Sequence, residues 1–335
     1  MTQSEADLLL PQKPTKAVSN PLRLKYLLIG PPKWGKTTFM CAANDSILLA
    51  TEEGHAFHET HKIIIDSWDR PYSEKKQGPG EDEDGNYHMS MAEAVEAICA
   101  SSRFQFIVID TADMAAKMCL DYHYKKFGVV HATDAGDFGR GWDVCLIQPF
   151  RLAIGALMHS GRGIGFITHT NLIEKKVGKT TSSRWETTLP SGIQKFLHTQ
   201  ADIILHASFG HKRKGQLERD RIISMDGTNE ILAGSRVRKV ALPKKFIVSP
   251  DEPWTQWAQF FSNPETVEQA DREYRELFLG GKEEDVEVQA EQQAETISGG
   301  NSEPSKAETT RAIQHSAECG DRIATLQEKR QTKTK

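Results

Sequence analysis

Short apolar segments alternate with helical segments from Leu24 onward, which is the pattern of a mostly parallel sheet flanked by helices. Apolar residues recur at helical spacing in Met89–Ser101 and in Pro149–His159. Two later apolar segments, Arg219–Met225 and Val237–Leu242, are predicted to extend the sheet at its edge as antiparallel strands. The predicted core strands are Leu24–Ile29, Ser46–Ala50, Lys62–Asp66, Gln105–Asp110, Gly163–Thr168 and Ala201–Ala207. The sequence therefore predicts an α/β fold.

Polar segments lie on both sides of this alternating region. Residues 1–20 are polar and mixed in charge, and we interpret them as a flexible N-terminal arm. Residues 21–280 form the predicted domain, in which 71–88 is a surface loop rich in glycine, proline and charge. The tail, 281–335, is rich in Glu, Gln, Ser, Thr and Lys, so we expect it to be largely disordered, with 307–329 able to form a helix.

Composition limits the classes of partner and the cellular location. The 335 residues carry a net charge of −4, so any contact with nucleic acid must come from local basic patches. The five cysteines are scattered without a C-x-x-C pair, which is typical of a reduced intracellular protein. The sequence shows neither a signal-peptide core nor an apolar run of membrane-spanning length. We therefore expect a soluble cytoplasmic protein that does not bind a membrane.

Residues Gly30–Thr37 read Gly-Pro-Pro-Lys-Trp-Gly-Lys-Thr, a complete G-x-x-x-x-G-K-[ST] phosphate-binding loop between a predicted strand and a predicted helix. Its glycines allow successive N–H groups to point into one concavity, Lys36 carries charge to the β- and γ-phosphates, and Thr37 can ligate Mg²⁺. We expect the loop to bind ATP and Mg²⁺. The predicted nucleotide contacts are Gly30, Pro31, Pro32, Lys33, Trp34, Gly35, Lys36, Thr37 and Thr38.

Trp34 is unusual, because most such loops carry small residues at its position. Its indole could stack against a neighbouring molecule or cover the phosphates, and the sequence does not choose between these two roles.

Polar residues that follow three predicted strands complete the expected site. Phe106–Asp110 has the form of a Walker B strand, so Asp110 is predicted to hold Mg²⁺ together with Thr37. Glu52 or Glu53 follows the strand after the loop helix and could activate the attacking water. A sensor of the γ-phosphate is expected on the strand between the loop strand and the Walker B strand, with Thr168 and His169 as candidates.

These motifs resemble the RecA-like core ATPases, and specifically the AAA-domain nucleotide-binding proteins of bacteriophages, some of which anneal single strands in phage recombination. The resemblance spans residues 22–250 and implies a RecA-like P-loop NTPase core. It maps the catalytic glutamate to Glu52, so that the implied catalytic set is Lys36, Glu52, Asp110 and His169. The segments that carry it are Gly30–Thr38, Thr51–Gly54, Phe106–Thr111, Asp137–Trp142 and Phe166–His169.

The same resemblance adds two segments and one difference. Leu189–Phe196, which contains Lys195, looks like the end of the RecA DNA-binding loop that leads into the next strand. Gly234–Lys239 is similar to the basic segment that touches the nucleotide of the neighbouring subunit, which would assign that role to Arg236, Arg238 and Lys239. The difference is that RecA has amides at the positions of Thr168 and His169.

The segment after His169 is predicted to be a loop that carries basic residues next to an aromatic ring. Positive charge can follow the phosphates of single-stranded DNA while a ring stacks on a base. A second basic cluster surrounds a predicted hairpin and could contact DNA or another subunit. The residues of the first group are Lys175, Lys176, Lys179, Arg184 and Trp185, and those of the second are Lys212, Arg213, Lys214, Arg219 and Arg221.

The leading functional hypothesis is a Mg²⁺-dependent ATPase that assembles as a homo-oligomer on single-stranded DNA in phage recombination or replication. One alternative is a nucleotide or small-molecule kinase, which would need an arginine-rich lid over its acceptor. Another is a non-hydrolysing, ATP-gated module that binds partner proteins through its tail. This last alternative predicts unchanged function when Glu52 is replaced by glutamine.

Overall fold

The computed structural model describes residues 18–70, 79–83, 85–136, 139–177, 180–212, 218–238 and 240–278, without the side chains of 175–177 and 180–182. The described residues up to Leu277 belong to one compact unit. The predicted arm up to residue 17 and the tail with its predicted helix lie outside the described residues. Asp137, Phe138, Lys179, Arg213, Lys214 and Lys239 also lie outside them.

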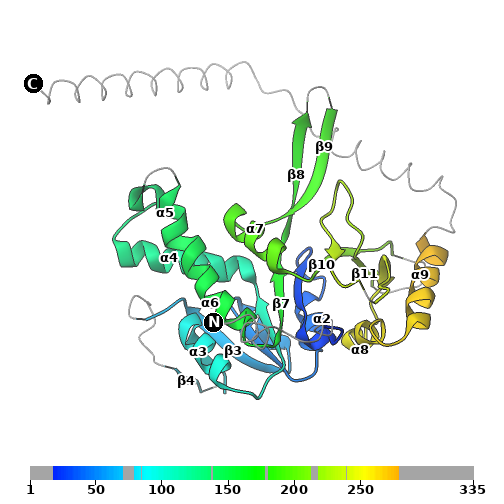
Figure 1. The fold of residues 1–335 in the computed structure, drawn as a ribbon, viewed down its shortest axis with the longest axis horizontal. Coiled ribbons are helices and arrows are strands. Elements are labelled where there is room, and N and C mark those ends of the chain that lie inside the picture. Colours follow the sequence, from blue (N-terminus) through cyan, green and yellow to red (C-terminus); the bar gives the residue numbers. More distant parts are fainter. Residues whose placement is uncertain are drawn as a thin grey trace, which may run out of the picture. The chain divides into compact units, whose positions relative to one another are not determined.

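The described residues form one large sheet of eleven strands, whose centre is parallel (Figure 1). Strands whose residues are apolar without alternating with polar ones are buried on both faces of the sheet. Every residue of the strands at 46–50 and 163–168 is buried in this way. The parallel strands, in spatial order, are β10 (Ile203–Phe209), β1 (Lys25–Ile29), β7 (Gly163–Thr168), β6 (Phe106–Asp110), β2 (Ser46–Ala50), β3 (His61–Ser67) and β5 (Tyr87–Ser90). All six predicted core strands are present: Ser46–Ala50 and Gly163–Thr168 match their predicted bounds, and the other four shift by one or two residues at their ends.

Antiparallel strands extend the sheet at both ends. The prediction of an edge strand at Arg219–Met225 is confirmed by β11 (Arg221–Ser224), which pairs antiparallel with β10. The predicted strand at Val237–Leu242 is wrong. Short strands form on either side of it instead, β12 (Gly234–Ser235) and β13 (Lys245–Ile247).

Proline explains why the chain before β13 is not a strand. Pro243 has no N–H group to donate to a sheet ladder and restricts the backbone of Leu242 before it. Val237 and Leu242 still contribute apolar surface, because both pack against the core from loops. The apolar pattern therefore indicated burial correctly and the element type incorrectly.

Part of the predicted surface loop at 71–88 belongs to the sheet. Residues 71–78 lie outside the described residues, but β4 (Gly80–Glu81) pairs antiparallel with β5, which itself runs parallel to β3. Ser90 at the end of β5 is buried and caps the following helix through its hydroxyl and Glu93.

Helices cover both faces of the sheet. The predicted helices are confirmed as α3 (Met91–Ala100) and α6 (Gln148–Met158). The helices α4 (Ala112–Phe127) and α7 (Ser191–Gln200), which cover the same face of the sheet, were not predicted. One face carries α3, α4, α6 and α7, and the other carries α2 (Lys36–Cys41), α8 (Pro253–Gln259) and α9 (Pro264–Phe278). The short helical segments are η1 (Pro21–Arg23), η2 (Glu53–Phe57), η3 (Ala132–Ala135), α5 (Arg140–Trp142) and η4 (Asp143–Ile147).

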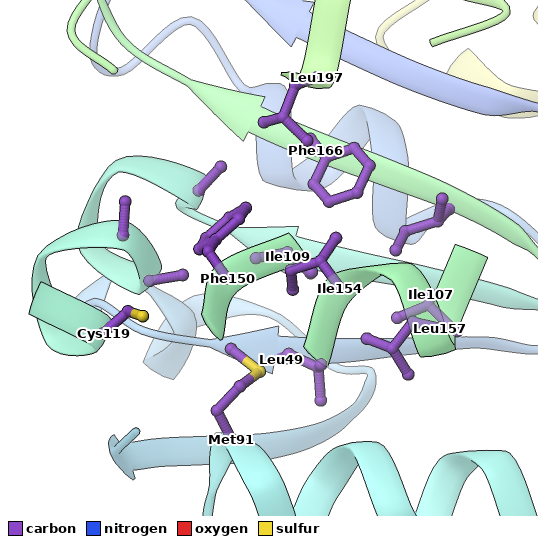
Figure 2. Packing of buried hydrophobic residues seen from close by; sticks show 14 of the residues in the cluster. Leu49, Met91, Ile107, Ile109, Cys119, Phe150, Ile154, Leu157, Phe166 and Leu197 are labelled. Carbon is purple, nitrogen blue, oxygen red and sulfur yellow. The ribbon is translucent and has the colours of Figure 1, made fainter. Parts of the chain in front are cut away.

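Two hydrophobic layers hold the sheet between these helices. On the first face, α6 places Phe150, Ile154 and Leu157 against Ile107 and Ile109 of β6 (Figure 2). The second layer is aromatic and includes Trp254 and Trp257 of α8. The carboxyl ends of the parallel strands are therefore held rigidly at one edge of the sheet.

Residues 170–187 form a two-stranded ribbon, where the sequence predicted a loop. β8 (Thr170–Val177) and β9 (Thr180–Thr187) pair antiparallel with each other and with no strand of the large sheet (Figure 1). Threonine and other residues that favour strands are frequent in both segments, which explains the pairing. The ribbon rises away from the sheet, directly after His169.

The segment after the ribbon also differs from its prediction. Leu189–Phe196 was expected to end a DNA-binding loop, but α7 begins at Ser191 and includes Lys195. Ile193 and Leu197 are buried one turn apart, so an apolar face at helical spacing holds this segment against the core.

Candidate nucleotide-binding site

The phosphate-binding loop curls between β1 and α2 because of its two glycines. A Cβ atom on Gly30 would lie 2.6 Å from the Cβ of Ala207 in β10, so only glycine fits there without a shift. Gly35 has φ of 95°, a left-handed conformation that favours glycine, and it precedes the first residue of α2. The loop amides and the N-terminus of α2 therefore face the same side, as phosphate binding requires.

Trp34 anchors this loop to the core. Its side chain is 1% exposed, and its Nε1 donates a hydrogen bond to the carbonyl oxygen of Ser208 at 2.7 Å. The indole also packs edge-on against Phe39 of α2. Both roles left open by the sequence are wrong for this side chain, because a buried indole neither covers phosphates nor stacks on another molecule.

Lys36 is buried and held by the loop itself. Its Nζ donates to the carbonyl oxygens of Gly30 at 3.0 Å and Pro31 at 2.8 Å, and it lies 3.4 Å from Nδ1 of His169. Burial lowers the pKa of Lys36 to about 8, although nearby carboxylates, first of all Asp110, act in the opposite direction. An anionic ligand at the loop would restore the charged form of this lysine.

Thr37 and Asp110 bring two oxygen donors together. The Thr37 hydroxyl donates to Oδ2 of Asp110 at 2.5 Å. Burial raises the pKa of Asp110, whereas the bond from Thr37 lowers it. A hydroxyl and a carboxylate are hard oxygen ligands of the kind that Mg²⁺ takes beside phosphates and water, so these two residues fit the predicted ion.

Glu52 faces the site from the end of β2. Its Oε1 accepts a hydrogen bond from the Thr111 hydroxyl at 2.6 Å, and its Oε2 lies 3.8 Å from Nε2 of His169. The nearby His169 imidazole, followed by the hydrogen bond from Thr111, lowers the pKa of Glu52 against the effect of burial. Glu53 is exposed at the start of η2, so the geometry favours Glu52 as the ionised carboxylate of the site.

The strand order agrees with the expectation for the sensor strand. β7 lies between β1 and β6, and it ends beside the loop, since the Gly30 amide donates to the Thr168 carbonyl oxygen. The imidazole of His169 lies between Lys36 and Glu52. The Thr168 side chain is buried and donates to Asp113, so of the two sensor candidates only His169 faces these groups.

Thr111 and Asp113 lie near the site without having been predicted there, and Arg221, predicted as part of the second basic cluster, lies beside the loop as well. Thr111 caps α4 and orients Glu52, and Asp113 in the first turn of α4 accepts bonds from the end of β7. Arg221 of β11 lies beside Gly35, where an added Cβ would approach its Nη1 to 2.9 Å. The pattern Thr-x-Asp after a buried strand is a helix-start signal that could have indicated the first two. The position of Arg221 beside Gly35 results from the pairing of β11 with β10, which no local sequence pattern indicates.

The basic residues predicted to bind DNA fall on two different elements. Arg184 and Trp185 lie on β9, where Trp185 is 39% exposed and pairs directly across from Leu172, which is 49% exposed. Lys175 and Lys176 lie on β8, with side chains outside the described residues, and Lys195 lies exposed on α7. The loop predicted after His169 is therefore a ribbon, and Lys195 lies on a separate helix.

Arg236 and Arg238 lie at the opposite edge of the sheet from the phosphate-binding loop. They line a cavity of about 650 Å³ together with Arg23 and Lys25, which lead into the amino end of β1. The Arg236 guanidinium donates to the Thr199 carbonyl oxygen at 2.6 Å. These arginines do not approach the loop of their own chain.

The fold and this corner define a class of protein. A phosphate-binding loop after β1, a carboxylate at the end of β6 and a polar strand end between them form the core of a P-loop NTPase. A family model described as an AAA domain matches residues 22–237, and the chain belongs to that family. The domain is therefore a nucleotide-binding P-loop NTPase.

Comparison with solved structures gives two distant similarities. A KaiC-like protein from Pyrococcus horikoshii is 12% identical with a TM-score of 0.37. The flagellar accessory protein FlaH from Methanocaldococcus jannaschii is 10% identical with a TM-score of 0.34. Each similarity covers 70% of this chain and 89% of the other chain. Among curated proteins, no match to the chain is found.

Within the described residues, no helix combines the length and the apolar character that crossing a membrane would require.

Proposed function

We propose that the protein is a Mg²⁺-dependent ATPase that acts on single-stranded DNA. The observation that supports hydrolysis is the convergence of Lys36, Asp110, Glu52 and His169, which come from four separate segments, around one phosphate-binding loop. A site that only bound nucleotide would not need an oriented, ionised carboxylate facing its lysine.

Each residue has a distinct part in the proposed reaction. Lys36 leaves the loop carbonyls and binds the β- and γ-phosphates, where its charge stabilises the transition state. Thr37 and Asp110 would hold Mg²⁺, which supplies further positive charge to the phosphates when bound. Glu52, fixed by Thr111, orients a water toward the γ-phosphorus and accepts its proton as the bond to ADP breaks.

The proposal for DNA depends on the ribbon. Trp185 and Leu172 present a half-exposed cross-strand pair on one face of the ribbon, and Arg184, the residue before Trp185 on β9, carries positive charge on the opposite face. Bases of every type stack on aromatic rings, and phosphates bind nearby cations, so this surface suits a single strand without a defined sequence. Recombination or replication of DNA is the process in which such an ATPase would act.

The proposed homo-oligomer depends on the arginines at the other edge. Arg236 and Arg238 lie exposed at the amino edge of the sheet, while the loop lies at the carboxyl edge. Head-to-tail stacking of copies would place these cations of one copy toward the loop of the next, where they would contact the nucleotide in trans together with Lys239.

Phosphate release from ATP, with and without Mg²⁺ and oligo(dT), tests the proposal across a salt series. We expect Mg²⁺-dependent release that oligo(dT) stimulates at low salt and that loses this stimulation at high salt, because phosphate contacts release counterions. Release that is absent in every condition would overturn the ATPase. Turnover that requires a small acceptor and ignores oligo(dT) would overturn the DNA role.

A further inference from the structure

Asp113 holds both ends of the β8–β9 ribbon at once. Its Oδ1 accepts hydrogen bonds from the hydroxyls of Thr168, at 3.0 Å, and of Thr188, and its Oδ2 accepts one from the His169 amide at 3.2 Å. Thr168 and His169 lead into β8, and Thr188 directly follows β9. The Thr188 amide also donates to the His169 carbonyl oxygen, which closes the base of the ribbon.

The same base carries the imidazole of the nucleotide site. His169 lies 3.4 Å from Lys36 through Nδ1 and 3.8 Å from Glu52 through Nε2. Asp113 is itself close enough to the lysine to raise its pKa. The Asp113 carboxylate therefore connects His169, which faces the phosphate-binding loop, with Thr188 at the end of β9.

Asp113 is suited to this connection by its position. It lies in the first turn of α4, where the helix N-terminus favours negative charge, and α4 is packed into the core through Ala112, Ala115 and Ala116. Thr168 is fully buried at the end of β7, whereas Thr188 is exposed. The bond to Thr188 thus joins a fixed carboxylate to the exposed side of the arrangement, where solvent competes for the hydroxyl.

We propose that Asp113 is a positioning residue that couples the ribbon to the nucleotide site. When Lys36 leaves His169 and the loop carbonyls for the phosphates, the imidazole loses a neighbour and the start of β8 shifts. Asp113 and Thr188 pass this shift to β9. The reverse also holds, so a strand of DNA bound along the ribbon sets the position of His169. This inference rests on the proposed function and adds its means of regulation.

Hydrogen exchange of the ribbon amides at saturating MgADP tests this coupling. In the wild type, ADP should change exchange in 171–174 and 183–187. In Thr188→Val the ADP-dependent change should fall at least about fivefold, the lower end of typical couplings between sites, and Thr188→Ser should retain it. Asp113→Asn should also lose it, because its NH₂ group replaces one acceptor oxygen with a donor.

The control is Thr199→Val, which removes an exposed hydroxyl bonded within α7, and it should match the wild type. A purely structural role for Thr188 would raise exchange equally with and without ADP and leave the difference intact, which would overturn the inference. A ribbon that does not respond to ADP in a wild type that binds it would also overturn it. Failure of the wild type to bind ADP, seen separately by calorimetry, would remove the proposed function and this inference together.

Discussion

The phosphate-binding corner and the β8–β9 ribbon are built in different ways. The corner collects Asp110, Glu52 and His169 from the ends of three strands and Lys36 from the start of a helix, and each of these side chains has a partner there. The ribbon is formed by consecutive residues and presents Leu172 and Trp185 half-exposed. A site that performs chemistry needs groups that a buried sheet holds in place. A surface that contacts a flexible polymer needs only two neighbouring strands paired in register.

Replacing Glu52 with glutamine should break the chemistry of the corner and leave the ribbon intact. We expect ATP turnover to fall about 10²- to 10⁴-fold, because glutamine cannot accept the proton of the attacking water. ADP binding, measured by calorimetry, should persist. Glu53→Gln is the matched control, since Glu53 is exposed and its loss should leave turnover within about twofold. Equal turnover in both variants and the wild type would favour the non-hydrolysing module.

Replacing Trp34 with alanine tests whether the corner depends on core packing. Removing a fully buried tryptophan should lower the free energy of unfolding by about 3–5 kcal/mol, because a cavity forms and the bond to Ser208 is lost. Urea unfolding followed by circular dichroism measures the change. Trp142→Ala, at a residue 42% exposed on α5, should cost about 0.5 kcal/mol or less. Similar costs for the two variants would contradict the anchoring role of Trp34.

Replacing Trp185 with alanine tests the ribbon as a contact surface. The affinity for oligo(dT), measured by fluorescence anisotropy at fixed salt, should weaken by about 1–3 kcal/mol, the range for one stacked base. Trp142→Ala removes a ring of similar exposure elsewhere and should not change this affinity. An equal loss in both variants, or in neither, would show that the ribbon ring does not stack on bases.

The lowered pKa of Lys36 gives the corner a pH dependence. Burial lowers this pKa to about 8, so the free protein loses the lysine proton as pH rises through that value. Binding of phosphates requires the charged form, and ADP affinity should therefore weaken by up to about tenfold per pH unit above 8. Lys36→Arg keeps its charge, so calorimetry between pH 7 and 9 should show no such decline. The same decline in that variant would assign the titration to another group.

Much of the corner could be predicted because its residues follow recognisable strands. Gly30–Thr37 leads from β1 into α2, and Asp110 ends and Glu52 follows a buried apolar strand, which any parallel sheet would bring to one edge. The choice between Glu52 and Glu53 could not be made, because it depends on which carboxylate turns toward Thr111. The prediction of a strand at Val237–Leu242 failed, because apolar residues beside a proline indicate that a segment is buried but not which element it forms.

The sequence by itself determined the fold class, the phosphate-binding loop and the three strand ends that meet beside it, because apolar periodicity and glycine placement are local properties. Only the tertiary structure decided that Trp34 belongs to the core, that residues 170–187 pair as a ribbon, and that Asp113 joins this ribbon to His169. These outcomes depend on contacts between segments far apart in the chain, such as Trp34 with Ser208 and Asp113 with Thr188. No local pattern of polar and apolar positions specifies such contacts.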